Sequence, residues 1–489
     1  MSKLFRSWDV DQGWVLPPSL HDYVPPGHLA HFVRDTVREA LDLSAIMDCY
    51  TEPRGQPPYH PAMLVALLLY GYSRGIYSSR QLARACEERV DMMAVTGLNR
   101  PDFRTISDFR KRHLQALSDL FVQVLRLCRA AGLAKLGHVA VDGTKLRANA
   151  SKHKAMSYKR MQQQEPQLAA EVRSWMEQAQ AADAAEDARH GPDRRGDETP
   201  DWMADKQLRL ARIRDAMAQL EAEALAGRDA CDPDGPGPSS GMQERGRRKK
   251  VRTPTSDNPT SDNPTSDNPT SDNPTSDNPT SDNPASDNPA SDNPAPSAPV
   301  PPEKAQRNFT DGDSRIMPSQ GGFIAGYNAQ AAVDAESQVI VAQRLSTNPA
   351  DFDGLQPLMD DIIAQLGQPP GQVSGDTGFA SEANLNAMDA RGIDPYLCPG
   401  RMRHGSTDPE GARTLKRTPR MQKMAETIRS AGREGPYRLR KQVVEPVFGQ
   451  IKHARGFRQF LLRGLHNVRG EWAMLCTAHN LNKLHKANP

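Results

Sequence analysis

Cysteine is scarce in this sequence of 489 residues, and the six that occur are scattered without any Cys-x-x-Cys pair. Such spacing favours neither a disulfide framework nor a zinc site. No run of eighteen apolar residues is present, and the opening segment MSKLFRSWDVDQGW lacks the apolar core of an export signal. We therefore expect a soluble protein of a reducing cytoplasm that has no membrane partner.

A glycine-rich phosphate loop is also missing, so the sequence gives no indication of a nucleotide cofactor. A large net charge is absent too, because 62 Lys and Arg residues stand against 60 Asp and Glu. The distribution of charge is uneven, however, and residues 401–489 hold nineteen Lys and Arg against six Asp and Glu. A cationic end of this kind is suited to binding a polyanion.

Proline, in contrast, is abundant, with 40 residues, while hydrophobic residues make up only 37% of the chain. This balance indicates globular parts joined to a sizeable unfolded part. Eight copies of Ser-Asp-Asn-Pro recur every five residues between Ser256 and Pro294. A period of five with a proline in each unit fits neither helix nor strand, so we predict a disordered linker from about 228 to 302. The preceding residues, about 155–225, are rich in Ala, Gln, Glu and Arg, which predicts long exposed helix.

Residues 19–131 have the pattern of a helical region, with apolar residues at helical spacing after Pro61. Thr105, with Asp108 three residues later, indicates the start of a basic helix. Two short helices, the second of which begins with basic residues, would suit a helix-turn-helix. A plain helical bundle with a charged outer face is the alternative. The basic side chains that we expect to contact DNA here are Arg104, Arg110, Lys111 and Arg112.

Two short segments, the first of them apolar and β-branched, are each followed by an aspartate with a glycine close behind. Val139-Ala140-Val141 precedes Asp142, and Gln372-Val373-Ser374-Gly375 precedes Asp376. We interpret both as buried strands that carry the acid at the carboxyl end. Further strands are expected within 321–332, 337–345 and 394–397, with helices between them, so this part of the chain is predicted to be α/β.

A third acid, Glu445, precedes Pro446 in a basic segment. Because proline lacks an N–H and is tolerated only in the first turn of a helix, we expect Glu445 to lie in such a turn. Lys452 follows seven residues later, almost two turns on, and so shares a face with Glu445.

Three carboxylates at the ends of strands and helices are the ligands that a pair of Mg²⁺ or Mn²⁺ ions would need for phosphodiester cleavage. Neighbouring Lys and Arg side chains would then hold DNA phosphates. The alternative is that each acid caps a helix or pairs with a nearby arginine. From spacing alone, both interpretations stay open.

Several stretches resemble the DDE transposases of bacterial insertion sequences, and together they cover about two-thirds of the chain. They are HPAMLVALLLYGYSRGIYSSRQL, HVAVDGTKLRANAS, GYNAQAAVD, SGDTGFAS, VVEPVFGQIKHARGFRQFLLRG and RGEWAMLCTAHNL. The resemblance implies a ribonuclease H-like catalytic fold, two divalent metal ions and binding to the terminal inverted repeats of the element. The two aspartates and the glutamate of the family motif match Asp142, Asp376 and Glu445.

Many members of this family also have a tyrosine and an arginine at fixed distances before the glutamate, and a lysine after it. The spacing from Glu445 to Lys452 fits the motif. Before Glu445, however, the tyrosine and the arginine of this sequence lie one residue away from the positions that the motif gives them. Arg438 and Lys441 occupy the tyrosine and arginine positions, with Tyr437 and Arg440 beside them. Which pair has the motif's roles is therefore open. The expected DNA contacts in the catalytic region are Lys145, Arg440, Lys441, Lys452 and Arg455.

The expected fold is α/β, with a ribonuclease H-like mixed sheet flanked by helices. An all-helical DNA-binding domain, residues 1–133, precedes the catalytic domain, residues 134–154 plus 303–489. Residues 155–302 form an insert that is helical and then disordered. The resemblance implies cleavage at the ends of the element and joining of the 3′ ends to target DNA, by a homo-oligomer assembled on double-stranded DNA. The alternatives are a transposase-derived DNA-binding protein without catalysis and a structure-selective nuclease without joining activity.

Overall fold

The computed structural model describes residues 19, 23–51, 57–190, 201–229, 300–319, 322–400, 418–432 and 434–487. The chain forms two compact units, one of residues 1–220 with 302–489 and one of residues 221–301. The Ser-Asp-Asn-Pro repeat lies outside the described residues, so its disorder stays a prediction. Of the helices within the described ranges, none combines the length and apolar character that crossing a bilayer requires.

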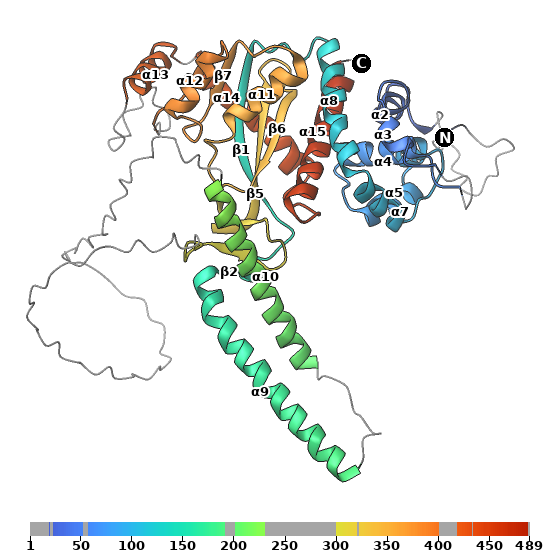
Figure 1. Cartoon of the computed structure of the whole chain (residues 1–489). Helices are drawn as coiled ribbons and strands as arrows, with labels where there is room; N and C mark the ends of the chain where they lie inside the picture. Colours follow the sequence, from blue (N-terminus) through green and yellow to red (C-terminus); the bar gives the residue numbers. More distant parts are fainter. Residues whose placement is uncertain are drawn as a thin grey trace, which may run out of the picture. The chain divides into compact units, whose positions relative to one another are not determined.

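The first part of the chain is helical, as predicted (Figure 1). Helix α4 (Pro61–Ser73) is buried on nearly every side and begins with its proline, whose missing N–H costs nothing there. Helix α7 (Phe103–Arg112) begins earlier than predicted, because the Asp102 carboxylate, not Thr105, caps it by accepting the Arg104 amide at 2.8 Å. The other helices are α2 (Leu29–Glu39), α3 (Ser44–Met47), α5 (Ser79–Glu88), α6 (Val90–Thr96) and α8 (Leu114–Ala130).

A mixed sheet follows, in the order β4–β5–β1–β7–β8, with β6 also paired to β5 (Figure 1). Strand β1 is antiparallel to β5 and parallel to β7, and β7 is parallel to β8. The predicted strands are confirmed, and β4 is a strand that was not predicted from the sequence. Their bounds are β1 (His138–Arg147), β4 (Arg315–Ser319), β5 (Gly322–Asp334), β6 (Ile340–Ser346), β7 (Gln372–Gly375) and β8 (Asp394–Leu397).

Helices flank this sheet and join it to the N-terminal helices. Helix α14 (Pro436–Gly449) contacts β1 and β7, and α11 (Leu355–Leu366) contacts β6. Helix α15 (Leu465–Ala487) contacts β6 as well as α4 and α8, so one continuous apolar core extends from the N-terminal helices to the sheet. The Trp472 side chain is fully buried in that core and donates to the Gln330 carbonyl of β5 at 3.4 Å, so it anchors the last helix to the sheet. Two further helices are α12 (Glu382–Ala390) and α13 (Pro419–Ser430).

Helix α14 corrects one expectation about Glu445. Pro446 lies inside the helix, ten residues after its start at Pro436, so Glu445 is not in a first turn. Proline removes the hydrogen bond that the carbonyl four residues earlier would accept. That carbonyl belongs to Gln442, and it accepts a hydrogen bond from the Gln338 side-chain amide at 3.2 Å instead. A donor from the turn between β5 and β6 therefore makes the internal proline tolerable.

The insert begins with two long helices, α9 (Tyr158–His190) and α10 (Asp201–Asp229), as predicted for its first part. Strands β2 (Ala155–Ser157) and β3 (Gln306–Asn308) pair with each other where the insert leaves and rejoins the core. Ion pairs from Lys206 to Glu171 and from Arg214 to Glu165 join the two helices. Because these pairs are partly exposed, each contributes little to stability, and the small apolar cluster around Met161 and Ile213 contributes more.

Candidate active site

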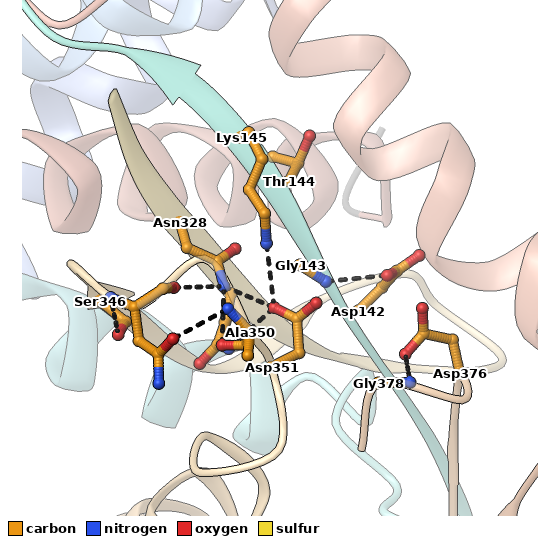
Figure 2. A network of polar contacts seen from close by, with 12 residues as sticks. Asp142, Gly143, Thr144, Lys145, Asn328, Ser346, Ala350, Asp351, Asp376 and Gly378 are labelled. Carbon is orange, nitrogen blue, oxygen red and sulfur yellow. Dashed lines mark hydrogen bonds and ion pairs between the residues drawn. The ribbon is translucent and has the colours of Figure 1, made fainter. Parts of the chain in front are cut away.

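Asp142 and Asp376 lie side by side on neighbouring parallel strands. The register pairs Val141 of β1 with Gly375 of β7, so the next residue on each strand is the aspartate. Strand β1 continues past Asp142 to Arg147, beyond the end that we predicted, because β5 pairs with it along this whole stretch. Strand β7 ends at Gly375, so Asp376 lies just past that end, near Asp142 of β1 (Figure 2).

The Asp142 carboxylate is mostly buried, with 19% of its side chain exposed. One oxygen accepts the Gly143 amide at 2.8 Å, and the other accepts the Arg440 guanidinium at 3.1 Å. Burial raises the pKa of Asp142 to about 6, Arg440 opposes the shift, and the charges of Asp376 and Asp351 add to it. The Asp142 carboxyl is thus kept partly protonated mainly by burial, with one arginine and two further acids close by.

Asp376 is held by the turn that follows β7. Its carboxylate accepts the Gly378 amide at 2.9 Å, and its carbonyl accepts the Phe379 amide at 3.1 Å (Figure 2). Phe379 is fully buried and fixes the turn to the core. A Cβ atom on Gly378 would lie 3.0 Å from an Asp376 oxygen, so glycine gives this tight turn its room.

Helix α14 brings Tyr437 and Arg440 to the two acids. The Arg440 guanidinium lies 5.8 Å from the centre of the Tyr437 ring while it pairs with Asp142. Burial, the neighbouring Cys398 and the Asp376 charge raise the pKa of Tyr437, and Arg440 opposes them. Lys441, the alternative from the slipped motif, is exposed. Tyr437 and Arg440 are three residues apart, close to one helical turn, so they share the face of α14 that meets the acids.

Lys452 also lies close to Asp142. Its ammonium group donates a hydrogen bond to the Thr144 hydroxyl, two residues along β1 from the acid. Burial and the nearby Arg458 lower the pKa of Lys452, and Asp142 opposes them. Lys452 belongs to a π-helical turn, Gln450–Ala454, that continues α14.

Glu445 is placed differently from the two aspartates. Its side chain is exposed, and among the described residues none forms a hydrogen bond or ion pair with it. Five residues separate it from Arg440, which turns it about 140° around a regular helix from the side chain that meets Asp142. Within the described ranges, no group of three His, Cys, Asp or Glu residues is arranged to hold a metal ion. Its role as the third acid therefore stays a prediction.

Two of the expected DNA contacts have other roles in the structure. Arg110 is 5% exposed, and its guanidinium donates to the Tyr72 hydroxyl, the Tyr77 carbonyl and the Ser79 hydroxyl. It joins α4, α5 and α7 instead of facing solvent.

Arg455 is the second. Its guanidinium contacts the buried imidazole of His479, and its carbonyl accepts the Tyr77 hydroxyl, so it lies where the N-terminal helices meet α15. The remaining basic residues predicted near α7, Arg104, Lys111 and Arg112, are exposed.

An acid that the sequence did not single out, Asp351, approaches the same site. It forms an ion pair at 3.3 Å with Lys145, which we had predicted to contact DNA. The two side chains are 16% and 18% exposed, respectively. Asp351 lies a few residues after β6, so an acid shortly after a third strand was the only pattern that could have pointed to it.

The donor set at this edge of the sheet fits a hard divalent cation. Carboxylate oxygens are the ligands that Mg²⁺ and Mn²⁺ prefer. Asp142 and Asp376 are adjacent and partly buried, and a bound cation would offset the burial and the neighbouring negative charges that raise the pKa of Asp142.

Two family models match the chain. One is described as a Transposase domain (DUF772) and matches residues 18–112, the N-terminal helical region. The other is described as a Transposase DDE domain and matches residues 295–481, which include Asp376 and Glu445. No curated protein matches the chain. No solved structure matches it either.

Proposed function

The chain belongs to the DDE transposases of insertion sequences, and we propose that it cleaves DNA at the ends of its element and joins the freed 3′ ends to target DNA. The observation that carries this proposal is the pairing of β1 with β7. It sets Asp142 and Asp376 next to each other, with two cationic side chains beside them. The mixed sheet, with helices packed on it, supports a ribonuclease H-like fold for this region.

Asp142 and Asp376 would hold two Mg²⁺ or Mn²⁺ ions, with Glu445 as the third acid. When bound, such a pair activates the attacking oxygen and stabilises the leaving oxygen of a phosphodiester. Arg440 keeps Asp142 in place, because its guanidinium is itself buried and paired. For Glu445 to join them, α14 or the Glu445 side chain would have to change orientation when DNA binds, since the carboxylate is now exposed.

Lys452 is suited to contact a DNA phosphate near the acids. Its ammonium is held by the Thr144 hydroxyl, so it is positioned before any DNA arrives. Lys441 and Lys145 would add further cationic contacts on either side of the acids. Each phosphate contact of this kind makes affinity fall with added salt.

The exposed face of α7 would bind the terminal inverted repeats through Arg104, Lys111 and Arg112. These three side chains are the basic residues of that helix that reach solvent, whereas Arg110 is buried beneath them. We expect a homo-oligomer on double-stranded DNA, since two ends of one element must be handled together.

A joining assay separates this function from its rivals. The full chain is incubated with Mg²⁺, a plasmid and labelled DNA from just outside the gene, where the inverted repeats are expected. A transposase cleaves the labelled end and joins it to the plasmid. Cleavage without joined product would indicate a nuclease, and binding without cleavage would indicate a DNA-binding protein that has lost catalysis.

A further inference from the structure

Asp351 lies in the loop between β6 and α11, on the face of β1 opposite Asp142 (Figure 2). The loop is fixed in several ways. The Ala350 amide donates to the Asn348 side chain at 3.0 Å, and the Asn328 side chain of β5 donates to the carbonyls of Asn348 and Ala350. Asp351 is therefore held in place by a loop that is tied to the central strands.

One oxygen of Asp351 accepts three hydrogen bonds. The donors are the Lys145 ammonium at 3.3 Å, the Gln330 amide at 3.1 Å and the Asn328 amide. Asn328 and Gln330 are fully buried, and they pair in register with Lys145 and Gly143 on β1. Two polar side chains inside a sheet cost free energy unless they are hydrogen-bonded, so their alignment on one carboxylate is a specific arrangement.

The other oxygen of Asp351 faces the turn that carries Asp376. A Cβ atom placed on Gly378 would lie 3.4 Å from this oxygen and 3.0 Å from an Asp376 oxygen. A Cβ placed on Gly143 would meet the first Asp351 oxygen at 2.5 Å. Asp351 thus fits between the glycines that follow the two acids, where a larger residue would collide with it.

A buried oxygen without a partner lies at the same place. Among the described residues, none donates a hydrogen bond to the side-chain oxygen of Asn328. That oxygen is 2.9 Å from the Cβ position on Gly143, so it lies beside Asp351 on this face of β1. A buried acceptor without a donor, beside the Asp351 carboxylate, adds negative potential that favours a cation nearby.

We propose that Asp351 is a positioning residue of the cation centre, which fixes Lys145 through one oxygen and adds a third negative charge beside Asp376 through the other. This rests on the proposed function, because the centre itself is part of that function. The ligand class is a divalent cation. Lys145 and Asp351 then have opposite effects on the affinity for the cation, because the positive charge of the lysine offsets the negative charge of the aspartate.

The test compares Asp351→Asn with Asp353→Asn, a matched control that is exposed in the same loop and bonds Asn348. Mn²⁺ binding to the full chain without DNA is measured by calorimetry, beside cleavage against Mg²⁺ concentration and a melting curve. We expect Asp351→Asn to weaken Mn²⁺ binding about 10–100-fold and to raise the Mg²⁺ requirement similarly, as for other residues around a metal site. Asp353→Asn should match wild type in both.

Lys145→Met separates an effect of the Asp351 charge on Mn²⁺ affinity from an effect of disturbed folding. It breaks the same ion pair but leaves the Asp351 carboxylate in place. Mn²⁺ should then bind at least as tightly as to wild type, although cleavage falls. Wild-type Mn²⁺ affinity in a folded Asp351→Asn variant would overturn the proposal. An equal loss of Mn²⁺ affinity in Asp351→Asn and in the control Asp353→Asn would also overturn it. If wild type neither binds Mn²⁺ nor cleaves DNA, the proposed function fails instead.

Discussion

The ion pair between Arg440 and Asp142 makes a quantitative prediction for Arg440→Gln. Both side chains are largely buried, at 8% and 19% exposed. Removing one partner of such a pair leaves the other charge uncompensated, which costs about 3–5 kcal/mol when that charge is present. The size of the loss therefore depends on whether Asp142 is ionised.

Protonation sets the pH window of this loss. The pKa of Asp142 in the folded protein is about 6, above its usual value, so the group is mostly neutral at pH 5 and mostly ionised at pH 8. The stability associated with a raised carboxyl pKa is present below the unfolded pKa and is lost as the pH rises through the folded pKa. Without Arg440 the pKa of Asp142 in the folded protein rises further, so the stability lost on going to high pH is larger in the variant than in wild type. We expect Arg440→Gln to cost about 3 kcal/mol at pH 8 and about 1 kcal/mol at pH 5.

Urea unfolding in the presence of a chelator measures this difference. Trp472 reports on it, because its buried ring stacks on Phe448 of α14, at 6.5 Å between ring centres. Lys441→Gln, an exposed change in the same helix, is the control and should stay within about 0.5 kcal/mol of wild type. An Arg440→Gln loss that is equal at the two pH values, or larger at pH 5, would refute the reasoning.

Three further predictions concern Glu471, Glu445 and the repeat. Glu471 is fully buried, and burial raises its pKa to about 7, although the backbone amides of Leu461 and Leu462 donate to its carboxylate. The stability that comes from this raised pKa is therefore lost as the pH rises from about 4.5 through 7. Glu471→Gln should remove about 3 kcal/mol of that pH dependence, seen in unfolding curves at pH 5 and 8; an unchanged slope would contradict it. Glu445→Gln should leave melting and DNA binding unchanged but lower cleavage at least about 100-fold, more than altering a neighbour of a metal ligand does; wild-type cleavage would remove Glu445 from the site. Deleting Ser256–Pro294 should leave strand transfer within about twofold, because the repeat has no apolar side chains to bury; lost activity in a folded protein would count against a linker.

The sequence was most informative where apolar runs end in an acid. Asp142 follows a short β-branched run and Asp376 follows the segment Gln372–Gly375, and the strands predicted from both are present. A short run of residues suited to a buried strand, closed by an acid and a glycine, is a local feature, so a single sequence is enough to reveal it. The two acids come together because β1 and β7 pair in parallel, which brings the residues after Val141 and Gly375 to the same edge of the sheet.

Long-range contacts explain what could not be predicted. Pro446 indicated a helix start, and this was wrong because Gln338, more than a hundred residues away in the chain, supplies a donor to the freed carbonyl. Arg110 shares its basic segment with exposed residues, and only the packing of α4 and α5 makes it buried. Asp351 has no periodic pattern around it, and its donors come from the register of β1 against β5.

Cleavage by Asp376→Asn is the most direct test of an active site at the Asp142–Asp376 edge. The variant keeps the size of the side chain and removes one of the two adjacent charges. It is assayed with Mg²⁺ on labelled DNA from the flanks of the gene, beside wild type and with DNA binding measured in parallel. We predict that it binds this DNA with wild-type affinity and neither cleaves it nor joins it to a plasmid. Cleavage at the wild-type rate by the folded variant would contradict an active site at this edge of the sheet.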